Sequence, residues 1–327
     1  MTSAAAEFAP IRLSTDDLPE RDRIAIWREV TGPVILRLDL SPVRDHEFRS
    51  DAVMRALPGL AMQWGFNSGI CLRRTRNLIS DGNDDLILPL STAGMSLHSQ
   101  RDAEVTLAEG NSVLMSSADV GCVTCFSGVW FTLLRLPRKA LAEMVIGVED
   151  MLMRPIPGDN EALRLLRSYV NVLRDDHALE TPELRHRVVA HVHDLVALTL
   201  GATRDVRAVA EGRGVRAARV HQIVAEIEAG FSDAGSSAAC VARKLGLSAR
   251  YVQELLSETG RSFTDRVIEL RLQKARTMLA DPRCDGMRVS DIAYGSGFND
   301  ISYFNRSFRR RFGASPLQYR GGNGQQP

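Results

Sequence analysis

Residues 241–248 read Val-Ala-Arg-Lys-Leu-Gly-Leu-Ser, and residues 292–299 read Ile-Ala-Tyr-Gly-Ser-Gly-Phe-Asn. In each stretch an alanine stands four residues before a glycine, and the residues that follow have the apolar spacing of a short helix. Two tightly crossing helices need a small side chain at their contact, and the turn between them favours glycine because its φ is positive. The repeat, offset by 51 residues, therefore predicts two helix-turn-helix units.

In the first unit, Ser248 is placed to cap a second helix. Three apolar residues with 3.6-residue spacing are expected to face inward, namely Val252, Leu255 and Leu256. The opposite stripe of that helix is then polar and consists of Arg250, Gln253 and Glu254.

The second unit follows the same pattern with one residue more in its turn. Its inward residues, Phe304 and Phe308, stand one position later relative to the glycine than their counterparts do. The turn 298–300 is therefore predicted to be longer by one residue. With that shift, the outward stripe consists of Ser302, Asn305 and Arg306, which match the outward positions of the first unit in polarity.

A helix predicted over residues 263–280 connects the two units. Its start is marked by possible capping residues near Ser262, and Pro282 prevents its continuation. At 1.5 Å per residue such a helix spans roughly 27 Å. This length suits two recognition helices in successive major grooves, which lie about 34 Å apart along one DNA turn.

The second unit and its tail resemble the AraC/XylS family of bacterial transcription regulators. The family pattern has a Gly-Phe pair, a Phe-x3-Phe helix with a basic residue, and a Gly-x-Ser/Thr-Pro-x2-aromatic-Arg close. This chain has Gly297-Phe298, then Phe304-x3-Phe308-Arg309, then Gly313-Ala314-Ser315-Pro316-x2-Tyr319-Arg320. Ser315 and Pro316 are expected to begin a last short helix that returns Leu317 and Tyr319 to the core. The resemblance covers about residues 223–320.

The resemblance implies six base-contacting positions, namely Arg250, Gln253, Glu254, Ser302, Asn305 and Arg306. An arginine reads guanine in the major groove, and Gln253 or Asn305 suits adenine. Glu254 either accepts from a cytosine amino group or orients Arg250. Arg309 is expected to face phosphate or solvent rather than bases.

The charge of the chain is divided unevenly. Residues 1–202 carry 21 Lys and Arg against 27 Asp and Glu, a net charge of −6, whereas residues 203–327 carry 20 against 13, a net charge of +7. The basic part is the part with the helix-turn-helix pair, as attraction to phosphates requires. A basic face that is simply solvated is the alternative.

The sequence predicts a cytoplasmic protein, associated with the nucleoid when bound to DNA. It shows neither a secretory signal nor a run of 18 apolar residues. Its five cysteines, an odd and low number, suit a reducing compartment. Cys122-x2-Cys125 lacks a second ligand pair to complete a metal site, so two thiols near a strand end are the expected interpretation, and no cofactor is predicted.

The N-terminal part has short apolar or alternating runs separated by turn residues, which predict an antiparallel barrel or sandwich. The expected strands are 34–39, 60–64, 70–74, 85–90, 95–99, 103–107, 112–115 and 130–136. An amphipathic helix is expected near residues 18–30. The turn at residues 108–113 fits a cupin-type barrel, and the family resemblance implies an effector domain of that kind in this position.

Four residues are candidates for an effector pocket, namely Trp64, Arg74, His98 and Trp130. Aromatic rings bind apolar groups and an arginine clamps a carboxylate. A cupin enzyme needs clustered histidines, and only His46 and His98 precede residue 140. The sequence therefore favours a ligand pocket without a metal over an enzyme.

Residues 141–200 are predicted to form helices, beginning at Glu161 and at Pro182, that serve as a dimer interface. The histidines of the second helix, His186, His191 and His193, are too far apart or point in different directions, so no metal site is expected there. The expected division is an effector-binding barrel at 1–140, helices at 141–200, a linker at 201–219, a DNA-binding domain at 220–320 and a flexible tail at 321–327.

The predicted fold class is α+β multidomain, with a cupin-like β-barrel and flanking helices followed by an all-α double helix-turn-helix domain. The predicted function is sequence-specific binding of double-stranded DNA at two adjacent major-groove segments. A homodimer is expected to activate transcription through RNA polymerase in response to a small-molecule effector. The alternatives are a metal-free or metal-dependent cupin enzyme with a DNA-binding tail, and an effector-independent DNA-binding regulator.

Overall fold

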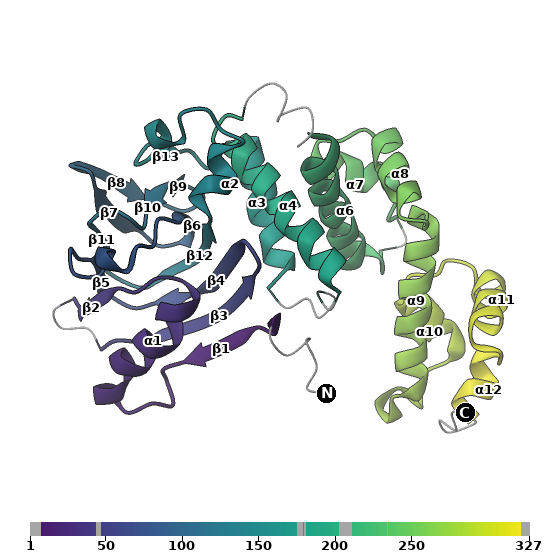
Figure 1. Ribbon diagram of the computed structural model, residues 1–327. Helices are drawn as coiled ribbons and strands as arrows, with labels where there is room; N and C mark the ends of the chain where they lie inside the picture. Colours follow the sequence, from purple (N-terminus) through teal and green to yellow (C-terminus); the bar gives the residue numbers. More distant parts are fainter. Residues whose placement is uncertain are drawn as a thin grey trace. The chain divides into compact units, whose positions relative to one another are not determined.

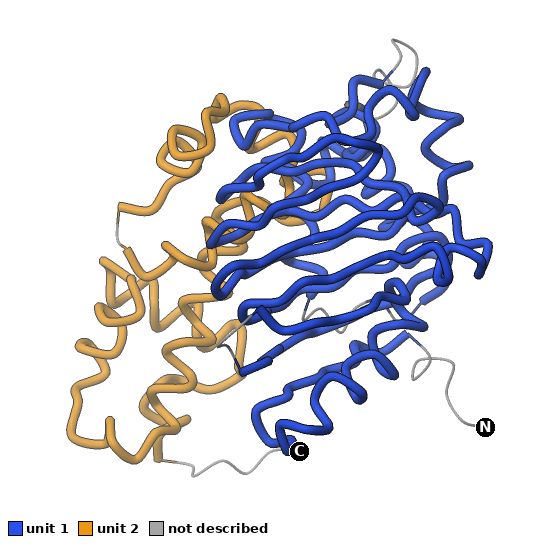
Figure 2. Tube along the Cα trace, turned by 90° about the vertical axis from the view of Figure 1, so that its left-hand side faces the viewer, with its two compact units in different colours: residues 1–218 blue, residues 219–327 orange. Residues whose placement is uncertain are grey.

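The chain divides into two compact units, Met1–Ala218 and Arg219–Pro327 (Figure 2). The computed structural model describes residues 8–43, 47–174, 179, 181–202, 211–233 and 235–321. Most of the tail predicted at 321–327, and residues 203–210 of the predicted linker, lie outside the described residues. Each unit has its own hydrophobic core, so each is considered by itself.

The N-terminal unit contains two antiparallel sheets (Figure 1). The larger sheet has the order β1 (Ile11–Ser14), β3 (Ser50–Leu57), β4 (Leu60–Asn67), β12 (Val129–Leu136), β6 (Leu86–Ala93), β9 (Ser112–Val113) and β13 (Pro155–Ile156), with β10 (Met115–Ser116) beside β6. The smaller sheet has the order β2 (Asp39–Pro42), β5 (Ile70–Arg74), β11 (Gly121–Cys125), β7 (Ser96–Gln100) and β8 (Ala103–Leu107).

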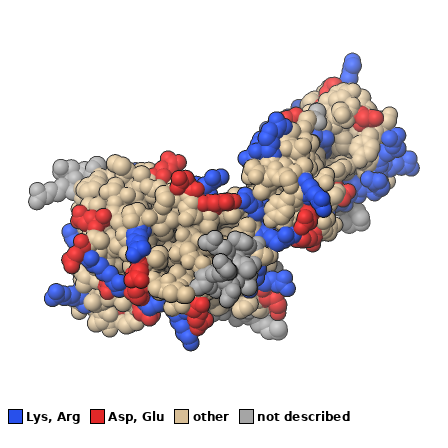
Figure 3. Space-filling model, turned by 90° about the horizontal axis from the view of Figure 1, so that it is seen from above, with Lys and Arg blue, Asp and Glu red and all other residues tan. Residues whose placement is uncertain are grey.

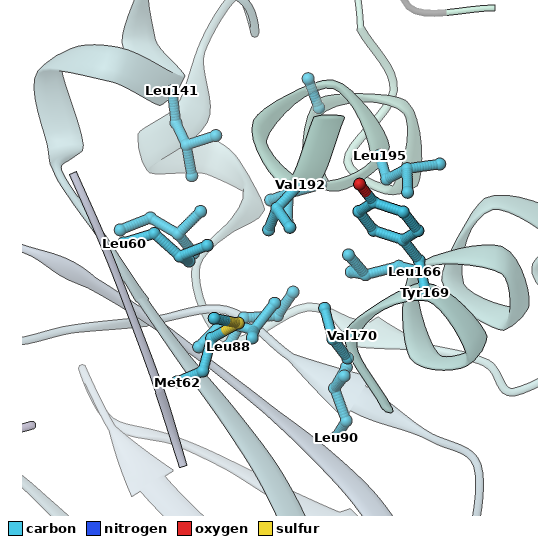
Figure 4. Packing of buried hydrophobic residues seen from close by; sticks show 14 of the residues in the cluster. Leu60, Met62, Leu88, Leu90, Leu141, Leu166, Tyr169, Val170, Val192 and Leu195 are labelled. Atoms are coloured by element: carbon cyan, nitrogen blue, oxygen red, sulfur yellow. The ribbon is translucent and has the colours of Figure 1, made fainter. Parts of the chain in front are cut away.

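The larger sheet is buried on both faces. One face packs on α2 (Arg138–Ala142), α3 (Glu161–Val172) and α4 (Pro182–Thr199), and Figure 4 shows Met62 and Leu88 of the sheet clustered with Val170 and Val192 of these helices. The opposite face contributes to a second core, which Trp27 of α1 (Glu20–Val34) joins. Burial on both faces explains the nearly continuous apolar run at residues 86–90.

The α+β class is confirmed, but the predicted barrel is not closed. Among the described strands, no hydrogen-bonded ladder joins the two sheets, so they form a sandwich. The strand predicted at 34–39 is wrong, because α1 continues to Val34 and β2 begins only at Asp39. Strand β3 was not predicted, because Ser50–Leu57 contains a single β-branched residue and two charged ones.

The C-terminal unit is helical. Its elements are α6 (Arg216–Gly230), which begins just before the unit boundary, then α7 (Ala238–Leu245), α8 (Ala249–Glu258), α9 (Phe263–Ala280), α10 (Val289–Gly295), α11 (Ile301–Phe312) and α12 (Pro316–Gly321). The connector α9 has the predicted bounds. Ser262 and Asp265 form a capping box at its start, and Pro282 follows its end.

The described end of the predicted linker is not extended. The short π-helical segment η4 (Glu211–Val215) packs on α4. Arg213 donates from Nε and Nη2 to the carboxylate of Asp194 at 2.7 and 2.8 Å, and Asp194 is 1% exposed. A Cβ atom at Gly214 would lie 2.9 Å from the Cβ of Asp194. This segment is therefore anchored to the N-terminal unit.

Both predicted turn glycines have positive φ, +67° at Gly246 and +98° at Gly297. The backbone N–H of the next residue donates to the carbonyl of the helix alanine in both units, from Leu247 to Ala242 at 2.8 Å and from Phe298 to Ala293 at 3.0 Å. The two glycines differ in their surroundings. A Cβ at Gly297 would lie 2.8 Å from the carbonyl oxygen of Ser232, whereas at Gly246 nothing lies within 4 Å.

We expect Gly297→Ala to destabilise the C-terminal unit more than Gly246→Ala does. Each substitution incurs the left-handed backbone penalty of about 1–2 kcal/mol. Gly297→Ala adds an overpacking cost of about 1–3 kcal/mol, because the neighbouring atoms include backbone. Urea unfolding followed by far-UV circular dichroism measures the difference, and all three tryptophans lie in the N-terminal unit, so their fluorescence is an internal control. Equal losses in the two variants would contradict this packing argument.

Candidate nucleic-acid interface and ligand cavity

Helix α8 presents the predicted polar stripe on its outer face. Arg250, Gln253 and Glu254 are exposed. The inward residues Val252, Leu255 and Leu256 are each 0% exposed. Ser248 caps the helix by accepting a hydrogen bond from the backbone N–H of Tyr251 at 3.2 Å, as predicted.

Helix α11 repeats this arrangement with an offset of 52 residues. Ser302, Asn305 and Arg306 are exposed, while Phe304, Ser307 and Phe308 are buried. Asp300 accepts from the backbone N–H of Tyr303 at 2.8 Å and stands 52 residues after Ser248. The turn is thus one residue longer than in the first unit, as the sequence predicted. Within the described residues, Arg250, Gln253, Asn305 and Arg306 form no side-chain hydrogen bond or ion pair.

Helix α9 holds the two units together by entering both of their cores. Val267 belongs to the core of the first unit, and Leu272, Ala275 and Leu279 belong to that of the second. Arg271 donates from Nε to the carbonyl of Phe231 at 2.7 Å and from Nη2 to that of Asp233 at 2.8 Å. The loop after α6 is therefore tied to the middle of α9, beside Gly297.

The end of the chain closes the second core with aromatic rings. The ring of Tyr319 lies 5.7 Å from that of Phe308 and 6.3 Å from that of Phe312. Leu317 was expected to return to this core, but it is 70% exposed. On a helix of six residues, only the stripe that contains Pro316 and Tyr319 faces inward.

The basic side chains of the C-terminal unit are largely on its surface, as Figure 3 shows. Arg309 and Arg310 are exposed at the end of α11. Arg311 instead donates to Glu269 of α9, with Nε 2.8 Å from Oε2, and this contact raises the pKa of the Arg311 guanidinium. Arg311 therefore ties α11 to α9, whereas Arg309 and Arg310 are exposed to solvent.

The N-terminal unit contains a cavity of about 110 Å³ between the two sheets and α1. Most of its wall is apolar. Its residues come from α1 and the segment after it, from the larger sheet and from the smaller sheet, and they include Trp27, Ile35, Leu72, Met115, Val123 and Phe131.

Two of the four predicted pocket residues line this cavity. Arg74 is 3% exposed, and its guanidinium binds the carboxylate of Asp81 at 2.6 and 3.0 Å. Nε of Arg74 also donates to the carbonyl of Ser117 at 3.0 Å. The charge of Arg74 is therefore compensated within the protein by Asp81.

His98 also lines the cavity and is 3% exposed. Its Nε2 lies 2.9 Å from Oγ of Ser96, and its Nδ1 lies 3.4 Å from Sδ of Met115. A thioether only accepts, so Nδ1 carries the proton and Nε2 accepts from Ser96. Burial lowers the pKa of His98 to about 4, which leaves the ring uncharged at neutral pH.

Trp64 and Trp130 do not line the cavity, because strand alternation points them to the opposite face of the larger sheet. In β4, Gln63 and Asn67 line the cavity while Trp64 packs in the helix-covered core. In β12, Phe131 lines the cavity while Trp130 is 51% exposed and its ring lies 5.2 Å from that of Phe66.

Three polar groups at the cavity were not predicted from the sequence. Oγ1 of Thr31, Nε2 of Gln63 and Oγ of Ser91 are buried, line the cavity and have no hydrogen-bond partner. Each unmet group costs about 1–3 kcal/mol, so these three groups need partners from water or from a bound molecule. No sequence signal identified them, because each sits in an ordinary helix or strand pattern.

Within the described residues there is no cluster of three or more His, Cys, Asp or Glu side chains suited to a metal ion. His191 lies 2.9 Å from the hydroxyl of Tyr169 through Nδ1, and His193 lies 2.9 Å from the carbonyl of Gly59 through Nε2. These two histidines are half-buried, and their contacts are with a tyrosine hydroxyl and a backbone carbonyl. His46 lies outside the described residues. None of the described helices is long and apolar enough to span a membrane.

Comparison with known proteins finds relatives for both parts of the chain. A family model described as a helix-turn-helix domain matches residues 241–322. The transcriptional activator RhrA of Rhizobium meliloti (strain 1021) is 24% identical over 312 residues, which cover 95% of this chain and 96% of RhrA. The HTH-type transcriptional activator RhaS of Citrobacter koseri is 31% identical over 166 residues, covering 50% of this chain and 56% of RhaS.

Among solved structures, the AraC-like transcriptional activator CuxR matches with a TM-score of 0.49 and 17% identity, covering 88% of this chain and 100% of that chain. The matched helix-turn-helix segment contains α8, α9, α10, α11 and the closing Gly-x-Ser-Pro sequence. The chain is thus similar over nearly its whole length to a transcriptional activator, and its C-terminal unit matches a helix-turn-helix domain.

Proposed function

We propose that this protein is a sequence-specific DNA-binding transcription activator that responds to a small molecule. One observation carries the DNA-binding part of the proposal. Two capped helices expose three polar residues each, at positions related by the same 52-residue offset, and one continuous helix enters the cores of both. The exposed stripes of α8 and α11 contact the bases, and α9 keeps these two helices at a spacing suited to adjacent major-groove segments.

The six exposed residues differ in the bases that they suit. Arg250 reads guanine through O6 and N7, and Gln253 or Asn305 reads adenine. Glu254 accepts from a cytosine amino group or orients Arg250, while Ser302 and Arg306 complete the second stripe. Arg309 contacts phosphate at the end of α11.

Activation, rather than repression, is proposed because both RhrA and RhaS are named as activators. In this proposal the protein acts in the bacterial cytoplasm as a homodimer that pairs through the helices of residues 141–200, and it contacts RNA polymerase at the promoter. Because RhrA and RhaS are named as transcriptional activators, we infer that the N-terminal unit is a sensor rather than an enzyme.

The cavity favours a compact, uncharged effector. Its one arginine is paired with Asp81, and its histidine is neutral. The unmet polar groups of Thr31, Gln63 and Ser91 provide hydroxyl and amide partners within an apolar wall. An effector with one or two hydrogen-bonding groups on an apolar body matches this lining. An effector-independent regulator is the second candidate, and it predicts that the cavity binds nothing.

We expect Arg250→Ala to cost about 1–3 kcal/mol on the specific DNA site, roughly 5- to 150-fold in Kd, and to relax the preference at one base pair. The site is first selected from random DNA with the full-length protein, and Kd values are then measured on that site and on scrambled DNA. Arg283→Ala is the matched control, since Arg283 is exposed and pairs with Asp281 in the loop before α10. This control removes the same charge and should lose little affinity for the specific site.

Asn305→Ala should change the base preference only in the DNA segment that α11 contacts, and not in the segment that α8 contacts. Equal losses on specific and scrambled DNA for Arg250→Ala would show that Arg250 contacts phosphate rather than a base.

We expect benzyl alcohol, a neutral ring-sized probe, to raise the Tm of the N-terminal unit and to change the fluorescence of Trp27, which lines the cavity. Benzoate, of similar size but charged, should do neither, because the cavity offers no uncompensated cation. Gln63→Leu should weaken the effect of the probe yet leave the free protein as stable or more stable, since it removes an unmet buried amide. Gln253→Leu, on the exposed face of α8, is the control. Binding of benzoate alone would contradict the neutral-ligand assignment.

The stability of the N-terminal unit should fall as the pH drops from about 6.5 to 4. The folded state keeps the pKa of His98 at about 4, while the unfolded chain titrates at the ordinary value of 6.5. The unfolded state therefore binds the extra proton in this window, at a cost to folding of about 3 kcal/mol by pH 4. Urea unfolding monitored by tryptophan fluorescence measures this effect. Over the same pH range, the free energy of unfolding of His98→Gln should fall by about 3 kcal/mol less than that of the wild-type protein. Parallel pH profiles for the two proteins would rule out a buried neutral His98.

A further inference from the structure

Two cysteine thiols lie in contact on neighbouring strands of the smaller sheet. Sγ of Cys71 on β5 is 3.0 Å from Sγ of Cys122 on β11. Oγ1 of Thr124 lies 3.7 Å from both sulfur atoms. Both cysteines are free thiols in this structure. The contact between the sulfur atoms is close enough that a covalent bond requires only a small approach.

The pairing differs from the one that the sequence suggests. Cys122 and Cys125 form a Cys-x2-Cys pattern, but residues three apart on a strand point to opposite faces. Cys125 is buried in the core between the sheets, whereas Cys122 alternates to the other face, where Cys71 of the next strand meets it. The partner of Cys122 is thus 51 residues away in the sequence rather than three.

The register of the strands makes this a diagonal pair. Cys71 lies opposite Thr124, and Cys122 lies opposite Arg73. Diagonal neighbours in an antiparallel sheet have Cα atoms about 7–8 Å apart, beyond the usual range of a relaxed disulfide. A bond between these sulfur atoms must draw the strands together, and strained disulfides are the ones that are readily reduced again.

The two thiols differ in access. Cys71 is 8% exposed, while Cys122 is half-buried and also borders a surface groove with Arg73 and Arg101. Burial, and secondly the contact with Cys71, raise the pKa of the Cys122 thiol. At neutral pH the Cys122 thiol is thus protonated, and its oxidation should accelerate with pH.

We propose that Cys71 and Cys122 form a reversible disulfide on reaction with a low-molecular-weight disulfide such as oxidised glutathione. The Cys122 thiolate attacks one sulfur of the glutathione disulfide, so one glutathione leaves as thiolate and the other remains bonded to Cys122. The Cys71 thiolate then attacks Sγ of Cys122 and releases the second glutathione. Two protein thiols are oxidised, one glutathione disulfide is reduced to two thiols, and the protons of Cys71 and Cys122 end on glutathione.

The bridge would act on the cavity wall. Strands β5 and β11 are neighbours in the smaller sheet, and the cavity is lined by Leu72 and Arg74 of β5 and by Cys122, Val123 and Cys125 of β11. Drawing Cys71 toward Cys122 on one face shifts the backbone that carries these residues. The thiol pair therefore gives the N-terminal unit a chemical input that is separate from a bound effector.

The full-length protein is incubated with oxidised glutathione at pH 7 and at pH 8, and samples are quenched with acid. The samples are then alkylated with a maleimide under denaturing conditions and mapped by tryptic mass spectrometry. We expect a peptide bridged between Cys71 and Cys122 that carries no glutathione, and formation roughly tenfold faster at pH 8 than at pH 7. Dithiothreitol should return all five thiols to the alkylated form.

Variants separate the two steps. In Cys71→Ser, Cys122 should retain a bound glutathione because the resolving thiol is absent, while Cys125→Ser should form the bridge as the wild-type protein does. The wild-type peptide map decides the matter even if a variant does not fold. A bridge between Cys122 and Cys125, or full alkylation of Cys71 and Cys122 after prolonged oxidation at pH 8, would overturn the proposal.

Discussion

Helix α9 is shared between two hydrophobic cores, and the geometry of the DNA-binding unit depends on that sharing. Val267 packs in the first core and Leu272, Ala275 and Leu279 pack in the second, so neither core is complete without the same helix. The spacing of α8 and α11 is therefore set by the rise of one capped helix rather than by a loop. Rotating α8 relative to α11 would open both cores. Regulation is thus expected to act on this unit as a whole.

The larger sheet of the N-terminal unit has one face covered by helices and one face that borders the cavity. The helix-covered face forms a large core whose residues do not line the cavity, and Tyr169 and Leu166 are almost fully buried in it. The other face tolerates unmet polar groups at Gln63 and Ser91. Polar groups of this kind weaken a fold, and the packing of the first face offsets that loss. A binding cavity is compatible with a stable sheet because strand alternation keeps the two faces apart.

The sequence was most informative where the structure is local. Capping by Ser248 and the helical spacing of Phe304 and Phe308 depend on residues a few positions apart, and the register of α11 followed from that spacing. Strand β3 was missed because its stability comes from pairing with β4 rather than from its own composition. Leu317 was misplaced because helical spacing alone does not say which face of a six-residue helix finds a partner.

Contacts between distant residues could not be predicted, and they determine the character of the candidate cavity. Arg74 suggests a carboxylate clamp when considered alone, but its charge is compensated within the protein by Asp81. Trp64 and Trp130 are natural pocket residues by type, but the register of β4 and β12 turns them away. In each of these cases the residue type was informative about chemistry, whereas the direction of the side chain required the strand pairing.

The layer behind the cavity also determines how the N-terminal unit holds its last segment. Gln63 faces the cavity, and its neighbours Met62 and Trp64 on β4 face the helix-covered core that Val192 and Leu195 of α4 complete. On that same helix, Asp194 is buried and its charge is balanced by Arg213 of η4. Removing Arg213 would leave the buried charge of Asp194 uncompensated, which destabilises the contact between η4 and α4. Segment η4 therefore stays on α4 while that layer is intact.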